Sequence, residues 1–297
     1  MDRMRTLEVF VEVADCGSMA GAARKLSLSP PSVTRLLNEL EENLGVLLFH
    51  RTTRAVTLSE PGRTFLEDAR RILQEYQDAT DSVRGAHRAP KGVLRLTAST
   101  LFGQHYISPL VLDYLDQFGD VRVDAVYLDR VVNLVEEGFD VAVRIGPLAD
   151  SSLMATKVGQ VRRVVCGSRS YLEREGVPQT PADLARHSII SVSPITPSDD
   201  WRFGGKETAK VSPRLYYSSV MPAIGAAKAG WGLTRVLSYQ IGPDLGAGDL
   251  QTVLAEFEPE PLPIHLVHPE GRIASAKVRA FVDLARDRLR ASAYLNP

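Results

Sequence analysis

Short polar side chains and one guanidinium recur at helical spacing just after Pro30 and Pro31, opposite an apolar stripe. These side chains are Ser32, Thr34, Arg35 and Asn38. Hydroxyl, amide and guanidinium groups bond to phosphate oxygens and base edges in the major groove of DNA. Ser29 is placed to cap the helix, and prolines are tolerated in a first helical turn, where N–H groups lack helical partners. The pattern predicts a helix, beginning near Pro30, that reads DNA.

A basic turn follows this helix, within the stretch VLLFHRTTRAVTLS. Its apolar ends are typical of two short strands, and the turn between them carries Arg51, Thr52 and Arg54. Such a hairpin projects as a wing beside the groove. We therefore expect Arg51 and Arg54 at phosphates or in the minor groove, with Thr52 among the DNA contacts.

Two further helices must position these residues. Apolar residues recur at helical spacing in two earlier segments, at Met4, Leu7, Phe10, Val11 and Ala14, and at Met19, Ala22, Ala23 and Leu26. They predict a three-helix core before residue 45, with Gly17 ending the first helix. A helical bundle without a nucleic-acid role is the alternative, because residues 1–60 hold seven basic and eight acidic side chains. Placement favours DNA, since residues 24–54 hold five basic side chains against three acidic ones.

The stretch from Val9 to Gly62 resembles the N-terminal domain of LysR-type transcriptional regulators. The motifs that carry the resemblance are VA…GS, AA..L, S.P.V.R, LE..LG.LLF.R and TLSEPG. The resemblance implies a winged helix-turn-helix in which Ser32, Thr34, Arg35, Arg51 and Arg54 contact DNA. One departure is Pro30, where many members carry a Gln that can reach a base, so the base preference is expected to differ.

A polar segment with a heptad rhythm follows the wing, from residue 59 to residue 88. Its apolar positions are Leu66, Ala69, Leu73, Tyr76, Thr80 and Val83. These positions form one apolar seam on an otherwise charged helix, which favours pairing of the helix with its copy in a second chain. The alternative is that the helix packs on its own domain. A dimer presents two recognition helices, so the expected target is an interrupted inverted repeat in double-stranded DNA, with half-sites roughly 34 Å or a multiple apart. The resemblance agrees, because this stretch is similar to the family's dimerising linker helix.

Composition describes an ordinary globular protein of two or three domains, with 297 residues, 44% hydrophobic residues and a net charge of −1. No apolar run approaches the ~20 residues of a membrane span, and no signal core is visible, so we expect a cytoplasmic protein. Cys16 and Cys166 lie in different predicted domains, which argues against a disulfide, a metal site or a thiol switch. The histidines form no helix-spaced pair, so no metal or other cofactor is expected.

Alternating strands and helices occupy the second half of the chain. We expect a strand at 93–97, a helix at 99–118, a strand at 121–127, a helix at 130–137 and a strand at 139–145. Further strands are expected in VRRVVCGS, SIISVS, KVSPRLYYSS, GLTRVL and IHLVHP, with a helix from about Met221. Strand, helix and strand in succession predict an α/β fold with parallel sheets.

This half also resembles the LysR-type effector domain, in EEGFDVAVRIGPLADSSL, YLEREGVPQTPADLARHSII and AAKAGWGL. The resemblance implies a periplasmic-binding-protein-like domain of two α/β subdomains, joined by crossovers near 161–164 and 262–267. A C-terminal helix, about 275–291, is expected to return to the first subdomain. The resulting plan is a winged helix-turn-helix at 1–58, a linker helix at 59–88, subdomain I at 91–162 completed by 267–297, and subdomain II at 163–266. The resemblance also implies that dimers associate through effector-domain contacts into a homotetramer, so we expect a homodimer or a homotetramer.

Strand ends indicate where an effector binds, since ligands of parallel sheets sit outside the carboxyl ends of strands. The hydroxyls of Ser99 and Thr100, with the N–H groups of Leu101 and Phe102, are placed to hold a carboxylate or merely to cap a helix. Leu128 ends the second strand. Arg144 lies near the end of the third, where it binds an anionic effector or pairs with a neighbouring acid such as Asp140.

The resemblance adds Ser193, Trp201, Phe203 and Ser219 to this cleft, with Trp201 either a cleft wall or a core residue. The sequence therefore predicts a transcriptional regulator that binds DNA and a small-molecule effector, for which a carboxylate is one candidate. A solute-binding protein is opposed by the N-terminal DNA reader. An enzyme is opposed by the lack of a phosphate loop, a G-x-S-x-G elbow or a carboxylate pair.

Overall fold

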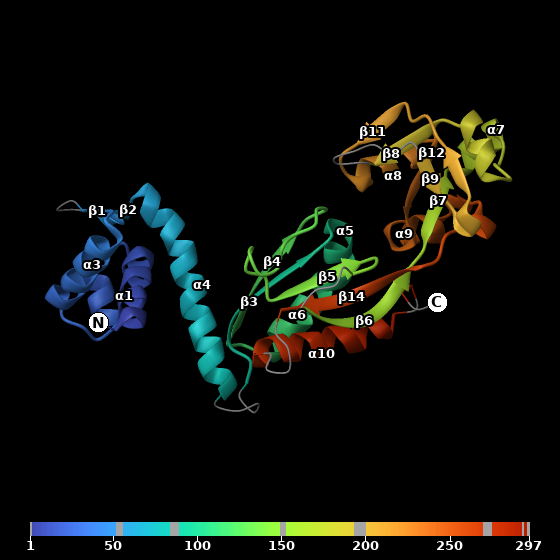
Figure 1. Cartoon of the computed structure of the whole chain (residues 1–297). Helices are drawn as coiled ribbons and strands as arrows, with labels where there is room; N and C mark the ends of the chain where they lie inside the picture. Colours follow the sequence, from blue (N-terminus) through green and yellow to red (C-terminus); the bar gives the residue numbers. More distant parts are fainter. Residues whose placement is uncertain are drawn as a thin grey trace. The chain divides into compact units, whose positions relative to one another are not determined.

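The computed structural model describes residues 2–51, 56–83, 89–148, 153–192, 200–269, 275–292 and 294–295. The chain divides into two compact units, Met1–Arg88 and Ala89–Pro297 (Figure 1). No helix in the described ranges is long and apolar enough to cross a membrane.

Three helices and a two-stranded hairpin begin the first unit. They are α1 (Arg3–Cys16), α2 (Met19–Lys25), α3 (Pro30–Leu44), β1 (Phe49–Arg51) and β2 (Val56–Leu58). Side chains of Asp2, Ser18 and Ser29 accept hydrogen bonds from first-turn N–H groups, and Gly17 ends α1 in the left-handed conformation. The predicted three-helix core, the start of α3 at Pro30 and the end of α1 at Gly17 are confirmed.

Aromatic contacts join these helices to the wing. The ring of Phe10, fully buried on α1, lies 5.4 Å from that of Phe49 on β1 and 5.2 Å from that of Phe65 on the next helix. Strand β1 pairs antiparallel with β2, so that Phe49 lies opposite Leu58. One apolar core therefore holds both the helices and the base of the wing.

Helix α4 (Glu60–Val83) lies within the segment 59–88, for which a linker helix was predicted, and its first half packs on its own unit. Ala69 is fully buried in the core formed with α1, and Leu66 and Leu73 pack against it. This part of the predicted seam therefore follows the alternative of packing on its own domain. Tyr76 is 56% exposed and remains available to a partner, whereas the side chain of Val83 lies outside the described residues.

The first sheet of the second unit has the strand order β4-β3-β5-β14-β6. Its strands are β3 (Gly92–Ala98), β4 (Val121–Tyr127), β5 (Val141–Ile145), β6 (Met154–Val161) and β14 (Leu262–His268). Helices α6 (Ser108–Gln117) and α10 (Ala276–Arg290) pack against it, so the C-terminal helix returns to this sheet as expected. A helical run of α5 (Thr100–Phe102) and a π-helical turn (Gly103–Ile107) leads into α6.

The second sheet has the order β11-β8-β12-β7-β13. Its strands are β7 (Arg163–Gly167), β8 (Ile189–Val192), β11 (Leu215–Tyr217), β12 (Leu233–Leu237) and β13 (Gln251–Val253). Around it lie α7 (Arg169–Glu175), α8 (Val220–Lys228), α9 (Gly242–Ala247) and the hairpin of β9 (Asp200–Arg202) and β10 (Thr208–Lys210). Four 3-10 turns complete the described elements, at Pro181–Arg186, Gly204–Lys206, Ser238–Gln240 and Ala255–Phe257.

Three expectations for this half are wrong in detail. Both sheets are mixed rather than parallel, because β14 runs antiparallel to β5 and β6, and β7 antiparallel to β12 and β13. Strand β14 begins at Leu262, so residues 262–266 lie in the first sheet and not in the second subdomain. The expected helix at 130–137 is a series of turns.

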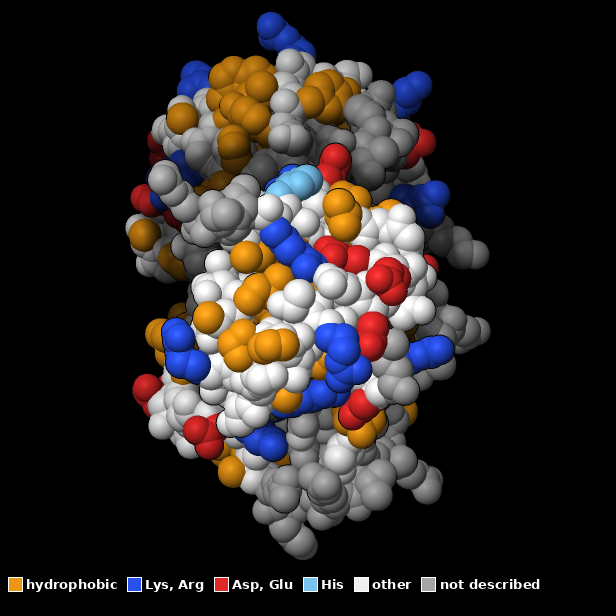
Figure 2. Space-filling model, turned by 90° about the vertical axis from the view of Figure 1, so that its left-hand side faces the viewer, with side chains coloured by type: hydrophobic (Ala, Val, Ile, Leu, Met, Phe, Trp, Pro, Cys, Tyr) orange, Lys and Arg blue, Asp and Glu red, His pale blue; other side chains and the backbone are white. Residues whose placement is uncertain are grey.

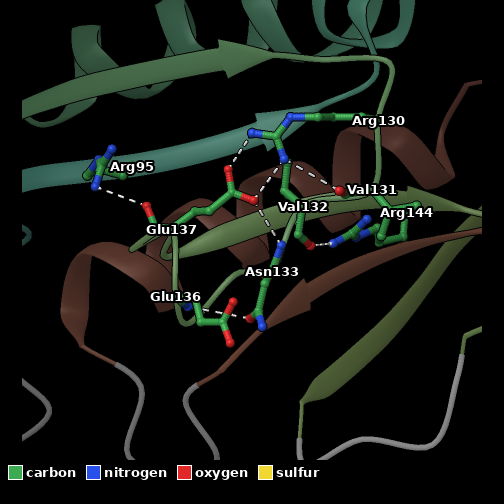
Figure 3. Close-up of polar contacts among 8 residues, drawn as sticks. All are labelled: Arg95, Arg130, Val131, Val132, Asn133, Glu136, Glu137 and Arg144. Carbon is green, nitrogen blue, oxygen red and sulfur yellow. Dashed lines mark hydrogen bonds and ion pairs between the residues drawn. The ribbon is translucent and has the colours of Figure 1, made fainter. Parts of the chain in front are cut away.

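Side chains explain these turns. The Glu137 carboxylate accepts the backbone N–H of Asn133, and the Asn133 amide oxygen accepts the N–H of Glu136 (Figure 3). The same amide oxygen also accepts the N–H of Val135. Side-chain acceptors thus take the N–H groups that helical carbonyls would otherwise bond.

Gly62 allows α4 to approach the chain at Leu48, because a Cβ atom at residue 62 would stand 2.0 Å from the Leu48 carbonyl oxygen. We expect Gly62→Ala to destabilise the first unit by about 3 kcal/mol or more, since backbone must move. Urea unfolding followed by circular dichroism measures the change. Gly225→Ala on α8, where the new Cβ meets nothing within 4 Å, is the matched control. An unchanged unfolding midpoint for Gly62→Ala would contradict this packing.

Candidate nucleic-acid interface and ligand cavity

The outer face of α3 carries the polar residues predicted from the sequence. Thr34, Arg35 and Asn38 are exposed, and Ser32 is half-buried. The Thr34 hydroxyl donates to the Pro30 carbonyl at 3.2 Å, and Arg35 Nη1 lies 3.2 Å from Glu39 Oε1. These are local contacts on one exposed helix, which DNA can replace because surface ion pairs stabilise little.

A buried carboxylate ties the wing to α3. Glu41 is 7% exposed, and its Oε1 accepts the N–H groups of Leu48 at 2.8 Å and Phe49 at 3.1 Å. Its Oε2 accepts from Arg51 Nη2 at 2.5 Å, and Arg51 Nη1 donates to Asn38 Oδ1 at 2.7 Å. Arg51, predicted as a phosphate contact, is therefore held 30% exposed between α3 and the wing.

The sequence analysis gave Glu41 no role of its own and counted it only among the three acidic side chains of residues 24–54. The signal was present, because Glu41 continues the buried stripe of Val33 and Leu37 at intervals of four residues. A carboxylate on an apolar stripe needs internal donors. Thr52 and Arg54 lie outside the described residues.

Charge on the first unit is mixed. Figure 2 shows Lys and Arg side chains beside acidic and apolar ones on the face that it presents. Attraction to DNA must therefore come from the placement of particular cations and not from a uniformly basic surface.

A cavity of 510 Å³ lies at one edge of the second sheet. It is lined by the ends of β8 and β12, the start of α8, residues of β9 and one residue of the first subdomain, Asp129. Strands β8, β11 and β12 are parallel and end at this edge, where open sheets bind ligands. The volume suits a small molecule.

Arginines dominate the charge of this cavity, which is lined by Arg163, Arg202 and Arg235. The Arg235 guanidinium lies 5.7 Å from the ring centre of Trp201 and 5.2 Å from that of Phe203, and donates to the Arg202 carbonyl. Burial, helped by the positive charge of Arg163, lowers the pKa of Arg235 to about 10. Arg235 stays charged at neutral pH.

Two of the residues predicted for an effector line this cavity, Trp201 and Ser219. Trp201 is 6% exposed and also belongs to the apolar core, so it is wall and core at once. Phe203 lies beneath Arg235 without lining the cavity. Ser219 is the N-cap residue of α8, and its side chain makes no capping hydrogen bond. Ser193 lies outside the described residues.

The residues predicted at the first strand end do not line the cavity. The N–H of Thr100 donates to Asp129 Oδ1 at 2.9 Å, so the chain's own carboxylate occupies the expected anion position. The Ser99 hydroxyl does not cap the helix but lies 3.3 Å from Tyr239 Oη in the second subdomain. Leu101 and Phe102 are buried, and the Phe102 ring packs at 5.3 Å on that of Tyr239.

Leu128 and Arg144 lie apart from the cavity lining as well. Leu128 packs against the apolar cluster of Val132 and Phe139. Arg144 donates to the Val132 carbonyl, and its burial lowers its pKa (Figure 3). The expected alternative partner, Asp140, instead accepts the Arg95 N–H at 2.7 Å.

Neither thiol is activated. The Glu12 carboxylate, 3.0 Å from Cys16 Sγ, raises the pKa of that thiol, and burial raises the pKa of Cys166 to about 12. Within the described ranges, no three His, Cys, Asp or Glu side chains gather as metal ligands.

Fold and site together define a winged helix-turn-helix DNA-binding protein with an attached ligand-binding domain. The chain belongs to the LysR family of transcriptional regulators, which are not enzymes. Residues 4–63 match the bacterial regulatory helix-turn-helix proteins of the lysR family, and residues 87–290 match the LysR substrate binding domain.

Relatives match almost the whole chain. The HTH-type transcriptional activator AaeR of Escherichia coli K12 is 30% identical over 97% of this chain and 94% of its own. A transcriptional regulator of Xanthomonas campestris is 33% identical over 95% of this chain and 84% of its own. The solved structure of CrgA, a LysR-type regulator from Neisseria meningitidis, is 30% identical, covers 96% of this chain and 98% of its own, and has a TM-score of 0.62.

Replacing Glu41 tests the link between α3 and the wing. Glu41→Ala leaves two buried N–H groups and Arg51 without their acceptor, so we expect a loss of about 3 kcal/mol in the free energy of unfolding. Glu41→Gln keeps one acceptor oxygen and should lose about 1–2 kcal/mol. Denaturant unfolding checks both. Glu42→Ala, at the exposed neighbour, should stay within about 0.5 kcal/mol of the original chain; equal losses at both sites would rule out a special role for Glu41.

Proposed function

We propose that α3 enters the major groove and contacts bases through Thr34, Arg35 and Asn38, while Arg51 contacts a phosphate from the wing. Ser32 joins these contacts at the start of α3, and Thr52 and Arg54 extend them along the wing. The observation that carries the proposal is the bond chain from Glu41 through Arg51 to Asn38, which gives helix and wing one fixed spacing. This function places the protein in the cytoplasm with its DNA.

The regulator responds to a small-molecule effector bound in the cavity beside Trp201, Ser219 and Arg235. The cavity borders both subdomains, because Asp129 comes from the first and the other lining residues from the second. An effector that prefers one subdomain arrangement shifts the population of arrangements by its difference in affinity. DNA binding responds to that shift.

Two copies pair through the second half of α4, beyond the part that Ala69 anchors in its own unit. The exposed Tyr76 ring supports this seam, since apolar surface on a charged helix favours burial against a partner. The dimer reads an interrupted inverted repeat. A homotetramer, built through effector-domain contacts, is the larger assembly.

Footprinting of the pure protein on genomic fragments at modest ionic strength tests the DNA-binding surface. We expect a protected interrupted repeat. Arg35→Ala and Thr34→Val should alter sequence preference, at about 1–3 kcal/mol per lost base contact. Arg51→Ala should weaken binding to all sequences and flatten its salt dependence. Arg169→Ala on α7 makes the same charge change outside this surface and should leave binding intact. Absence of any protected site would refute the proposal.

Tyr76→Glu tests the seam on α4. A carboxylate buried in the dimer contact is costly, so the mass measured by light scattering at micromolar concentration should fall by about half. Val177→Glu, at another exposed apolar position, should leave the mass unchanged. An unaltered mass for Tyr76→Glu would place the dimer contact elsewhere.

A further inference from the structure

The ligand cavity holds more positive charge than its own carboxylates neutralise. Arg163, Arg202 and Arg235 line it against two acids, Asp129 and Asp200. Asp129 is already engaged by the Thr100 N–H. The ion pairs found in the described part of the chain include none of the three arginines. Each of the three arginines therefore lacks an ion-pair partner among the described residues, although two acids share the lining.

Arg235 is the most constrained of these cations. Its guanidinium lies over two aromatic rings and donates to the Arg202 carbonyl, so it cannot leave the cavity without losing these contacts. Arg163, on the neighbouring strand β7, is close enough for its charge to disfavour the protonated form of Arg235. A half-buried cation next to a like charge is costly, and a bound anion relieves both costs.

The residue that the first subdomain contributes to the lining, Asp129, repels anions. The Asp129 carboxylate sits at the first turn of the helix that begins at Thr100, where the sequence predicted that an effector carboxylate would bind. Negative charge on a ligand is thereby directed to the arginines of the second subdomain. The apolar side chains of Ile190, Val192 and Leu237 line the remaining wall and suit a carbon skeleton.

We infer that the effector is a small dianion, either a dicarboxylate or a phosphate monoester, whose negative charge is shared by Arg163 and Arg235. A single carboxylate neutralises only one of these two arginines, whereas a doubly charged ligand neutralises both. The inference rests on the proposed effector role of this cavity.

Thermal melting of the full-length protein at constant ionic strength, followed by titration calorimetry, tests the charge requirement. The probes are sulfate, inorganic phosphate, glycerol phosphate, succinate and phthalate, each dicarboxylate beside its monoamide and diamide. We expect at least one dianion to stabilise the protein and to bind at least ten-fold more tightly than the monoanion of the same skeleton. Preference for phosphates or for dicarboxylates identifies the class. The inference is overturned if a dianion and its monoamide bind equally well. It is also overturned if no dianion stabilises the protein at about 10 mM.

Arg163→Gln tests the assigned residues. Arg163 is exposed at the start of β7, so the variant should fold, lose at least ten-fold in dianion affinity and keep its affinity for the monoamide within about two-fold. Arg169→Gln, the same change on α7 outside the cavity, should alter neither affinity. Unchanged dianion binding in Arg163→Gln overturns the assignment. Footprinting of Arg163→Gln without ligand separates the two proposals, since a retained footprint leaves the DNA-binding function standing whatever the anions do.

Discussion

The buried carboxylate of Glu41 is the constraint on which the proposed DNA-facing surface depends. Its two oxygens accept the N–H groups that begin the wing and the guanidinium of Arg51, which in turn bonds to Asn38 on α3. Recognition helix and wing therefore form one body with a single spacing. A groove of fixed width requires such rigidity, because contacts are lost when their relative position varies.

In the first unit the buried charge of Glu41 is paired within the chain, whereas the described part of the second unit leaves arginine side chains unpaired in its cavity. There the chain's own carboxylate, Asp129, accepts the N–H of Thr100 at the helix start where an effector was expected to bind. It leaves Arg163 and Arg235 facing a cavity without a paired acid. The first unit thus neutralises its buried charge internally, which gives shape, while the second leaves charge unneutralised, which gives affinity for a ligand.

Local patterns predicted the elements well where one residue decides them. Pro30 begins α3 and Gly17 ends α1 as expected, because a missing N–H and a left-handed φ are properties of single residues. The turns at 130–137 were missed, since the acceptors that replace helical bonds are side chains of Asn133 and Glu137. Apolar spacing on α4 was read correctly, but its first half is buried within the same unit.

From the sequence by itself, apolar periodicity, helix caps and the wing predicted an N-terminal domain that reads DNA, because each of these signals lies in neighbouring residues. The resemblance to LysR-type regulators implied the class of the protein. The sequence also predicted which side chains lie on the polar face of α3. Only the tertiary structure decided that Glu41 is a buried anchor, that Asp129 fills an anion position and that Arg163 and Arg235 share a cavity. Each of these depends on residues brought together from distant segments, and the energy of a charge is set by what surrounds it in space.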